Sequence, residues 1–149
     1  MSIAERTAST VWTGSLASGK GVVNGATGAL SDLPVTWVAR TEQPGGKTSP
    51  EELAAAAHSS CYSMALSLVL GQHKLTADKL TVSATVTLDE VDGVPTITTS
   101  ALTVDAQIPG ADDAAFQAIL QEAGKLCPIS RLFAGANITL EGKLSASDQ

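Results

Sequence analysis

Residues 49–71 read SPEELAAAAHSSCYSMALSLVLG, and this stretch predicts one long helix. Ser49 can cap the helix, the following proline suits the first helical position, and Glu52 stands where a capping box places it. After the first turn the segment is apolar around the whole helix, except that His58 and four serines cluster in its middle. Such a helix is expected to be buried on most sides, against a sheet or a partner subunit, rather than to cross a membrane.

The residues before this helix predict short strands and turns. Between residues 7 and 40, short apolar pieces are separated by glycines. The last piece, PVTWVAR, alternates as a strand does, which would place Arg40 on the face opposite Trp37. A glycine-containing loop then leads to the helix.

The residues after the helix predict a two-stranded excursion, a second helix and a closing strand. Residues 80–89 alternate strictly between apolar and polar side chains, Asp92 and Gly93 form a turn, and a return strand runs over about 95–108. The remaining elements are a helix opened by Asp112, a short helix over 128–132, a strand over 138–144 and a frayed tail over 145–149. We therefore expect one α+β domain over residues 1–149, with a mostly antiparallel sheet.

Composition and charge exclude several classes of function. The 149 residues include nine Lys and Arg against fifteen Asp and Glu, for a net charge of −6, which argues against nucleic acid or an anionic membrane as partner. The first residues have neither the basic nor the apolar part of a leader, so a cytoplasmic location is expected. In that compartment two cysteines are either buried and inert or take part in transient redox chemistry.

Cys61 and Cys127 are the candidate reactive groups. Cys61 lies among His58 and the serines, which suggests a polar cavity, and a thiol in a cavity becomes reactive when a nearby positive charge favours the thiolate. His58, three residues earlier on the helix, and Arg40 are the candidate cations; alternatively His58 is a buried histidine satisfied by the backbone or a serine. Cys127 follows Cys61 by 66 residues, a spacing typical of neither a CxxC motif nor a zinc site, so no metal is expected.

The segment SPEELAAAAHSSCYSMALS, with GKLCPIS downstream and VARTE upstream, resembles the OsmC branch of the OsmC/Ohr peroxidases. These are the osmotically inducible and organic hydroperoxide resistance proteins. The resemblance implies an OsmC-like fold with a long central helix, an intertwined homodimer with sites at its interface, and a cysteine-based peroxidase active in oxidative and osmotic stress defence. It also implies that no metal or prosthetic group is needed.

The resemblance also implies roles for single residues. By motif position, Cys61 would be the peroxidatic thiol and Cys127 the resolving thiol, Arg40 would hold the thiolate, and Glu51 would orient the arginine. This chain reads ARTE where the family commonly reads TRFE, so an aromatic residue beside Arg40 is lost.

The implied chemistry is hydroperoxide reduction through a Cys61 sulfenic acid and a Cys61–Cys127 disulfide. The disulfide would then be reduced by an external dithiol, which the resemblance suggests is of the lipoyl type. An apolar lining that includes Met64 and Leu53 would favour organic hydroperoxides over hydrogen peroxide.

The spacing of Glu51 and Cys61 raises a question about the site. On an unbroken helix these two residues are about 15 Å apart along the axis. Either the helix is interrupted soon after Glu52, or Glu51 serves the Cys61 of a partner chain. Two other functions compete with the peroxidase: a non-catalytic module that binds an apolar ligand, with bystander thiols, and a Cys/His hydrolase that uses His58.

Overall fold

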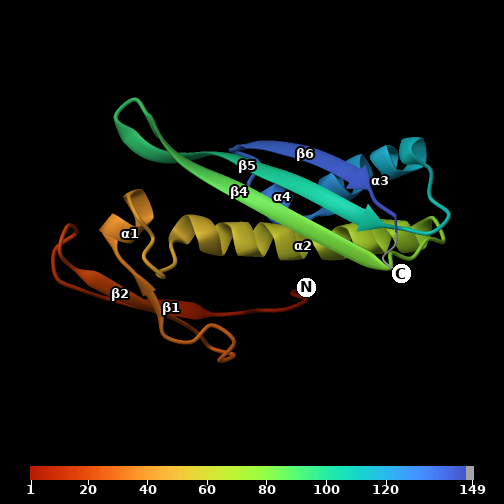
Figure 1. Ribbon diagram of the computed structural model, residues 1–149. Coiled ribbons are helices and arrows are strands. Elements are labelled where there is room, and N and C mark those ends of the chain that lie inside the picture. Colours follow the sequence, from red (N-terminus) through yellow and green to blue (C-terminus); the bar gives the residue numbers. More distant parts are fainter. Residues whose placement is uncertain (147–149) are drawn as a thin grey trace. The chain divides into compact units, whose positions relative to one another are not determined.

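Residues 1–146 are described by a computed structural model, in which the chain forms two compact units, Met1–Leu53 and Ala54–Gln149 (Figure 1). The first unit comprises β1 (Ala8–Thr13), β2 (Lys20–Gly25), β3 (Leu33–Val35), α1 (Trp37–Thr41) and the start of α2 (Pro50–Gln72). The second comprises the rest of α2, β4 (Lys79–Val91), β5 (Val94–Gln107), α3 (Asp113–Leu126), α4 (Pro128–Leu132) and β6 (Asn137–Leu144).

The first unit is a small antiparallel sheet with β2 in its centre, followed by α1. The strand expected to reach Arg40 ends at Val35, so this prediction is wrong for its second half. The cause is local: the Thr36 hydroxyl accepts a hydrogen bond from the backbone N–H of Ala39 at 3.0 Å and caps a helical turn. Because Trp37 and Arg40 are three residues apart on a helix, they lie on the same face rather than on opposite faces.

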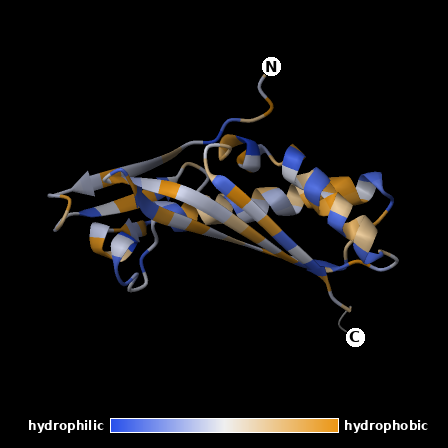
Figure 2. Ribbon diagram, turned by 90° about the horizontal axis from the view of Figure 1, so that it is seen from above, coloured by the Kyte–Doolittle hydropathy of each residue, from blue (hydrophilic) through white to orange (hydrophobic). Residues whose placement is uncertain are grey.

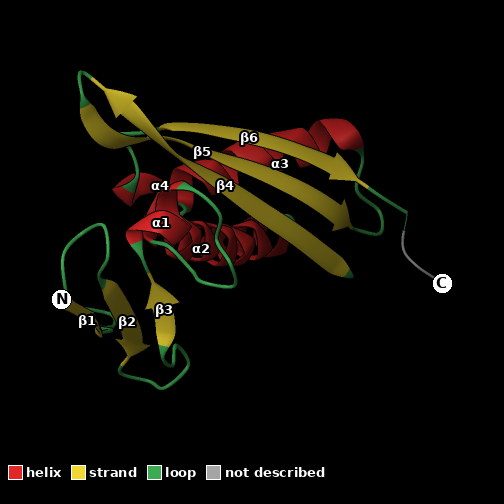
Figure 3. Cartoon of the chain, turned by 60° about the vertical axis from the view of Figure 1, so that its left-hand side comes forward, coloured by secondary structure: helices red, strands yellow, loops and turns green. Residues whose placement is uncertain are grey.

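The second unit is a three-stranded sheet in the order β4-β5-β6 (Figure 3). The hairpin between β4 and β5 turns at Asp92 and Gly93, whose φ angles of 53° and 79° fit a tight hairpin turn. Strand β6 pairs with β5 in parallel, whereas the β1–β2, β2–β3 and β4–β5 pairs are antiparallel. The predicted α+β class with mostly antiparallel pairing is therefore confirmed. The expected alternation along β4 is also present, and Figure 2 shows hydrophilic and hydrophobic residues alternating along these strands.

The core of the second unit joins α2, β5 and α3. Its largest fully buried side chains include Tyr62, Leu66 and Leu70 of α2, Leu102 of β5 and Phe116 of α3. These contacts fix α2 against the sheet, and α2 is where the candidate thiol lies.

Helix α2 begins as predicted and is unbroken. The Ser49 hydroxyl accepts from the Glu52 N–H at 3.1 Å, and the helix then continues to Gln72. The sequence suggested that the serines in its middle line a polar cavity, but Ser60 and Ser63 instead donate to carbonyl oxygens four residues back, each at 2.7 Å. Their polarity is therefore satisfied within the helix itself.

One face of α2 is exposed in the single chain. Met64 is 71% exposed and Leu68 57% exposed, so the helix is not buried on all sides by its own chain. By length and composition alone, α2 is also the one helix within residues 1–146 that could cross a membrane, but core helices pass the same test.

The end of the chain differs from the expected frayed tail. The N–H of Ser145 donates to the Ala106 carbonyl at 2.8 Å, which continues the pairing of the last strand beyond Leu144. The prediction is thus wrong at Ser145, while residues 147–149 lie outside the described part of the chain.

Candidate active site

The fold brings Cys61 and Cys127 together, although 66 residues separate them in the sequence. Cys61 lies in the middle of α2 and is partly buried, and Cys127 is fully buried at the start of α4. Both are free thiols, and they are near enough to each other for Cys127 to raise the pKa of Cys61. Neighbouring thiols are the groups that thiol–disulfide chemistry uses.

The surroundings of Cys61 do not favour its thiolate within the second unit. Burial raises the pKa of Cys61, and the hydrogen bond and charge of Cys127 raise it further. The backbone N–H of Ile129 donates to Cys61 and acts in the opposite direction, lowering its pKa. A more reactive Cys61 therefore needs a positive charge from elsewhere.

Arg40 and Glu51 form an ion pair within the first unit. The guanidinium donates through Nε to Glu51 Oε1 at 2.9 Å and through Nη2 to Oε2 at 2.8 Å. The side chains are 29% and 11% exposed, respectively, so the pair is partly shielded from water. This two-pronged geometry fixes the plane of the guanidinium, and the structure thus joins two of the residues singled out in the sequence.

Arg40 also has an aromatic neighbour. Its guanidinium carbon lies 5.9 Å from the centre of the Trp37 ring, within the range of a cation–π contact. The sequence comparison around ARTE indicated that an aromatic wall beside Arg40 is lost. Trp37, one helical turn before Arg40, supplies an aromatic contact, whereas the aromatic residue of the family motif follows the arginine.

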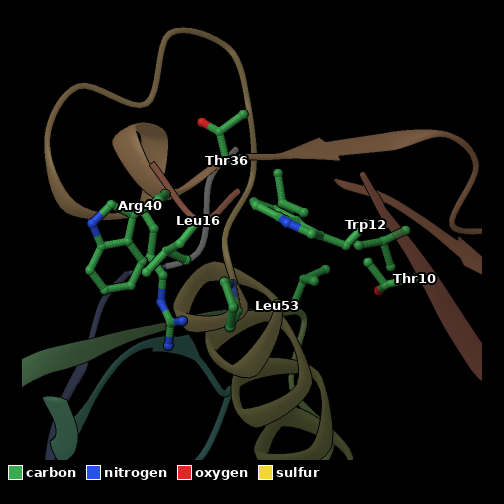
Figure 4. A pocket seen from close by; sticks show the side chains of 10 residues that line it. Thr10, Trp12, Leu16, Thr36, Arg40 and Leu53 are labelled. Atoms are coloured by element: carbon green, nitrogen blue, oxygen red, sulfur yellow. The ribbon is translucent and has the colours of Figure 1, made fainter. Parts of the chain in front are cut away.

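A cavity of about 580 Å³ borders Arg40 in the first unit (Figure 4). Trp12 of β1 and Leu53 of α2 point into it, and its lining is mostly apolar. The other lining residues are Thr10, Leu16, Val23, Val35, Thr36, Trp37 and Pro50. Leu53 thus lines a pocket, as the sequence suggested, whereas Met64 is exposed on α2.

His58 is not a cation beside Cys61. It is fully buried, with Nδ1 2.6 Å from the Ser100 hydroxyl and Nε2 2.8 Å from the Ser130 hydroxyl. Burial lowers the pKa of His58, which keeps the ring neutral. The interpretation as a buried histidine satisfied by serines is confirmed, and the Cys/His couple required by a hydrolase is wrong because both ring nitrogens are occupied.

Sequence reasoning missed the two serines that hold His58. Ser100 had a signal, since it is a polar residue in phase with Leu102 and Val104 on the apolar face of its strand. Ser130 had one too, as the last residue of the CPIS element. Neither signal names a partner.

The unbroken α2 bears on the two arrangements left open by the sequence. Because the helix continues from Pro50 to Gln72, it lacks the interruption soon after Glu52 that the first arrangement requires. Glu51 and Cys61 are then about 15 Å apart along the axis. Among residues 1–146, no group of three or more His, Cys, Asp or Glu side chains is placed to hold a metal ion.

Two adjacent reduced cysteines, one of them in the middle of a long helix of an α+β fold, define a two-cysteine thiol protein. Comparison with known proteins identifies the family. Residues 43–141 match the family described as OsmC-like protein, and the chain belongs to the OsmC family.

Relatives and solved structures agree with this assignment. The chain is 41% identical to "Peroxiredoxin OsmC" of Escherichia coli over 91% of this chain and 93% of that protein. It is 34% identical to an "Organic hydroperoxide resistance protein-like" protein of Mycoplasma pneumoniae over 83% and 87% of the two chains. The structure matches that of the organic hydroperoxide resistance protein OhrB of Bacillus subtilis with a TM-score of 0.74 and 26% identity, covering 92% and 98% of the chains. The predicted family and fold are confirmed.

Proposed function

We propose that the protein is a thiol-dependent peroxidase that reduces organic hydroperoxides with Cys61 and Cys127. The observation that carries this proposal is the contact between two free thiols brought together from positions 61 and 127. The relationship to a protein named peroxiredoxin, 41% identical over most of both chains, supports a cysteine-based peroxidase. Relatives named for organic hydroperoxide resistance support the substrate class.

The reaction takes two steps at the thiols. The Cys61 thiolate attacks the distal oxygen of the hydroperoxide, the O–O bond breaks, and the alcohol leaves after taking up a proton, which gives a Cys61 sulfenic acid. The Cys127 sulfur then attacks the Cys61 sulfur, the S–O bond breaks, and water leaves as the disulfide forms. An external dithiol, of the lipoyl type by resemblance, reduces the disulfide and is itself oxidised. No resident cofactor takes part.

Arg40 supplies the positive charge in this proposal, and Glu51 orients it. A fixed guanidinium favours the Cys61 thiolate and stabilises the charge that develops on the departing alkoxide. The Nε and Nη2 contacts with Glu51 leave Nη1 without a hydrogen-bond partner among residues 1–146, so one edge of the guanidinium remains available.

In this proposal the Arg40–Glu51 ion pair acts on the Cys61 thiol of a second chain. Ten residues of continuous α2 separate Glu51 from Cys61, which argues against a site built by one chain. Cys61, Met64 and Leu68 share one face of α2, because they are three and four residues apart, and the last two are exposed. An intertwined homodimer would cover this face and bring Arg40 of one chain to Cys61 of its partner.

The apolar cavity beside Arg40 favours organic hydroperoxides. A mostly apolar space of about 580 Å³ accommodates an alkyl or aryl group, and burying that group is favourable, whereas hydrogen peroxide gains nothing from it. Comparing kcat/KM for cumene hydroperoxide and hydrogen peroxide tests this preference. Equal efficiencies would contradict it.

A non-catalytic module that binds an apolar ligand is the second candidate, favoured by the same cavity. A coupled assay with a dithiol reductant on the wild type, Cys61→Ser and Cys127→Ser separates the two. The peroxidase loses turnover in both variants, and only Cys127→Ser still consumes one equivalent of peroxide. A binding module shows no peroxide-dependent loss of thiols in any of the three proteins. A cytoplasmic location, where thiols are kept reduced, fits the peroxidase.

A further inference from the structure

The turn from Cys127 to Ser130 points backbone N–H groups at both sulfurs. The N–H of Ile129 donates to Cys61, and the N–H of Ser130 donates to the Cys127 sulfur at 3.5 Å. The position of this single turn therefore sets the surroundings of both thiols at once.

His58 connects this turn to the core. Its Nε2 lies 2.8 Å from the Ser130 hydroxyl, and its Nδ1 lies 2.6 Å from the hydroxyl of Ser100 on β5. The Phe133 ring meets the His58 ring edge-on, with 5.3 Å between ring centres. His58, Ser100 and Ser130 are all buried, and the histidine and Ser100 are fully so, which means that water does not compete for these hydrogen bonds.

We propose that His58 is a positioning residue: through Ser130 it holds the turn over residues 127–130 so that its N–H groups face the sulfurs of Cys61 and Cys127. This inference rests on the proposed peroxidase function. The ring itself transfers no proton to the sulfurs, because both nitrogens are engaged by serines. The His58 ring acts by fixing the positions of two donors, the backbone N–H groups of Ile129 and Ser130.

The turn matters in both steps of the reaction. The Ile129 N–H stabilises the Cys61 thiolate before attack on the peroxide. After attack, Cys127 must reach the Cys61 sulfur as water leaves, and a turn displaced by 1 Å slows such a step strongly. Loss of the His58–Ser130 hydrogen bond is therefore expected to lower the reactivity of Cys61 and to slow disulfide formation.

Two conservative variants separate positioning from mere stability. In His58→Gln the side-chain amide can occupy the place of Nε2 and keep the hydrogen bond to Ser130. In His58→Asn the shorter amide can occupy the place of Nδ1, so it keeps Ser100 but releases Ser130. Val69→Ala serves as the control for lost stability, since Val69 is fully buried in the same helix, two turns beyond Cys61.

The first readout is alkylation of Cys61 by iodoacetamide across pH, followed by mass spectrometry of the Cys61 peptide. For His58→Asn we expect the midpoint of the profile to move upward. The rate at pH 7 should fall about threefold, because the greater nucleophilicity of a more basic thiolate offsets part of its lower population. His58→Gln and Val69→Ala should match the wild type. This readout uses no peroxide, so it tests the positioning of the turn even if the protein is not a peroxidase.

The second readout is disulfide formation after one equivalent of cumene hydroperoxide. His58→Asn should form the disulfide about tenfold more slowly and accumulate sulfenic acid that dimedone traps, whereas His58→Gln should not. Equal behaviour of the Asn and Gln variants in both readouts, or an equal loss in Val69→Ala, would overturn the proposal. A wild type that forms no disulfide would instead refute the proposed function.

Discussion

Mixing two inactive variants of this protein should restore activity, if Arg40 and Glu51 serve the thiol of a partner chain. The first variant, Cys61→Ser, lacks the attacking thiol. The second carries Arg40→Met together with Glu51→Gln, which removes both charges of the ion pair and leaves no unpaired charge in a partly buried place. Each variant alone fails in a different half of the proposed site.

The expected recovery follows from helix geometry and dimer symmetry. Ten residues of unbroken α2 place Glu51 and Cys61 about 15 Å apart, far beyond the reach of a direct contact. In a two-fold symmetric dimer with random exchange, about half of the dimers are mixed, and each mixed dimer holds one intact site out of two, so the mixture should reach about a quarter of wild-type activity. Loss of the cation alone is expected to cost about a hundredfold.

The assay is the initial rate of cumene hydroperoxide reduction with a dithiol reductant, before and after subunit exchange. Differently tagged chains that co-purify after exchange prove that mixed dimers have formed. Activity that stays at the mean of the two parents in such mixed dimers would show that each chain builds its own site. A monomeric protein with full activity would refute the shared site altogether.

Three further predictions concern single residues. Glu51→Gln should lower kcat/KM about 30-fold, since it weakens a charge-assisted hydrogen bond, whereas Glu52→Gln, in the same turn but exposed, should stay within about twofold; equal losses would show that charge alone matters. Gly142→Ala should destabilise the fold by about 1–3 kcal/mol in urea unfolding, because the new methyl group would collide with a buried leucine of α3, and an unchanged midpoint would contradict this packing. Ser145→Ala should raise the pKa of Asp105 measured by NMR, because the Ser145 hydroxyl holds that pKa below its usual range. A lowered pKa contributes stability that is lost as pH falls through the folded value, so the stability of the variant should be less sensitive to acid. An unchanged pKa of Asp105 in the variant would contradict the contact.

The sequence predicted most of the fold because its strongest signals are local. The cap at Ser49 and the alternation along β4 each report on a few neighbouring residues, and the structure confirms both. The failure at Trp37–Thr41 has a local cause as well. Apolar and polar residues alternate there over too few positions to separate a strand from one helical turn, and the Thr36 cap decides for the helix.

The candidate site was predictable only in part, because its contacts join distant residues. The family motif named Cys61, Cys127, Arg40 and Glu51, and the structure brings them together in two pairs. The partners of His58 lie 42 and 72 residues away, and no pattern along the chain specifies such distances. The polar cavity predicted from the serines of α2 was wrong because their hydrogen bonds are local. Ser60 and Ser63 donate to carbonyl oxygens of their own helix.

We propose that Cys61 and Cys127 act as one redox pair toward hydroperoxides. The most direct measurement is peptide mapping by mass spectrometry of the reduced protein after one equivalent of cumene hydroperoxide, without added reductant. We expect the loss of two thiols per chain and a Cys61–Cys127 disulfide within each chain. Two thiols that remain free after the peroxide is added would contradict it.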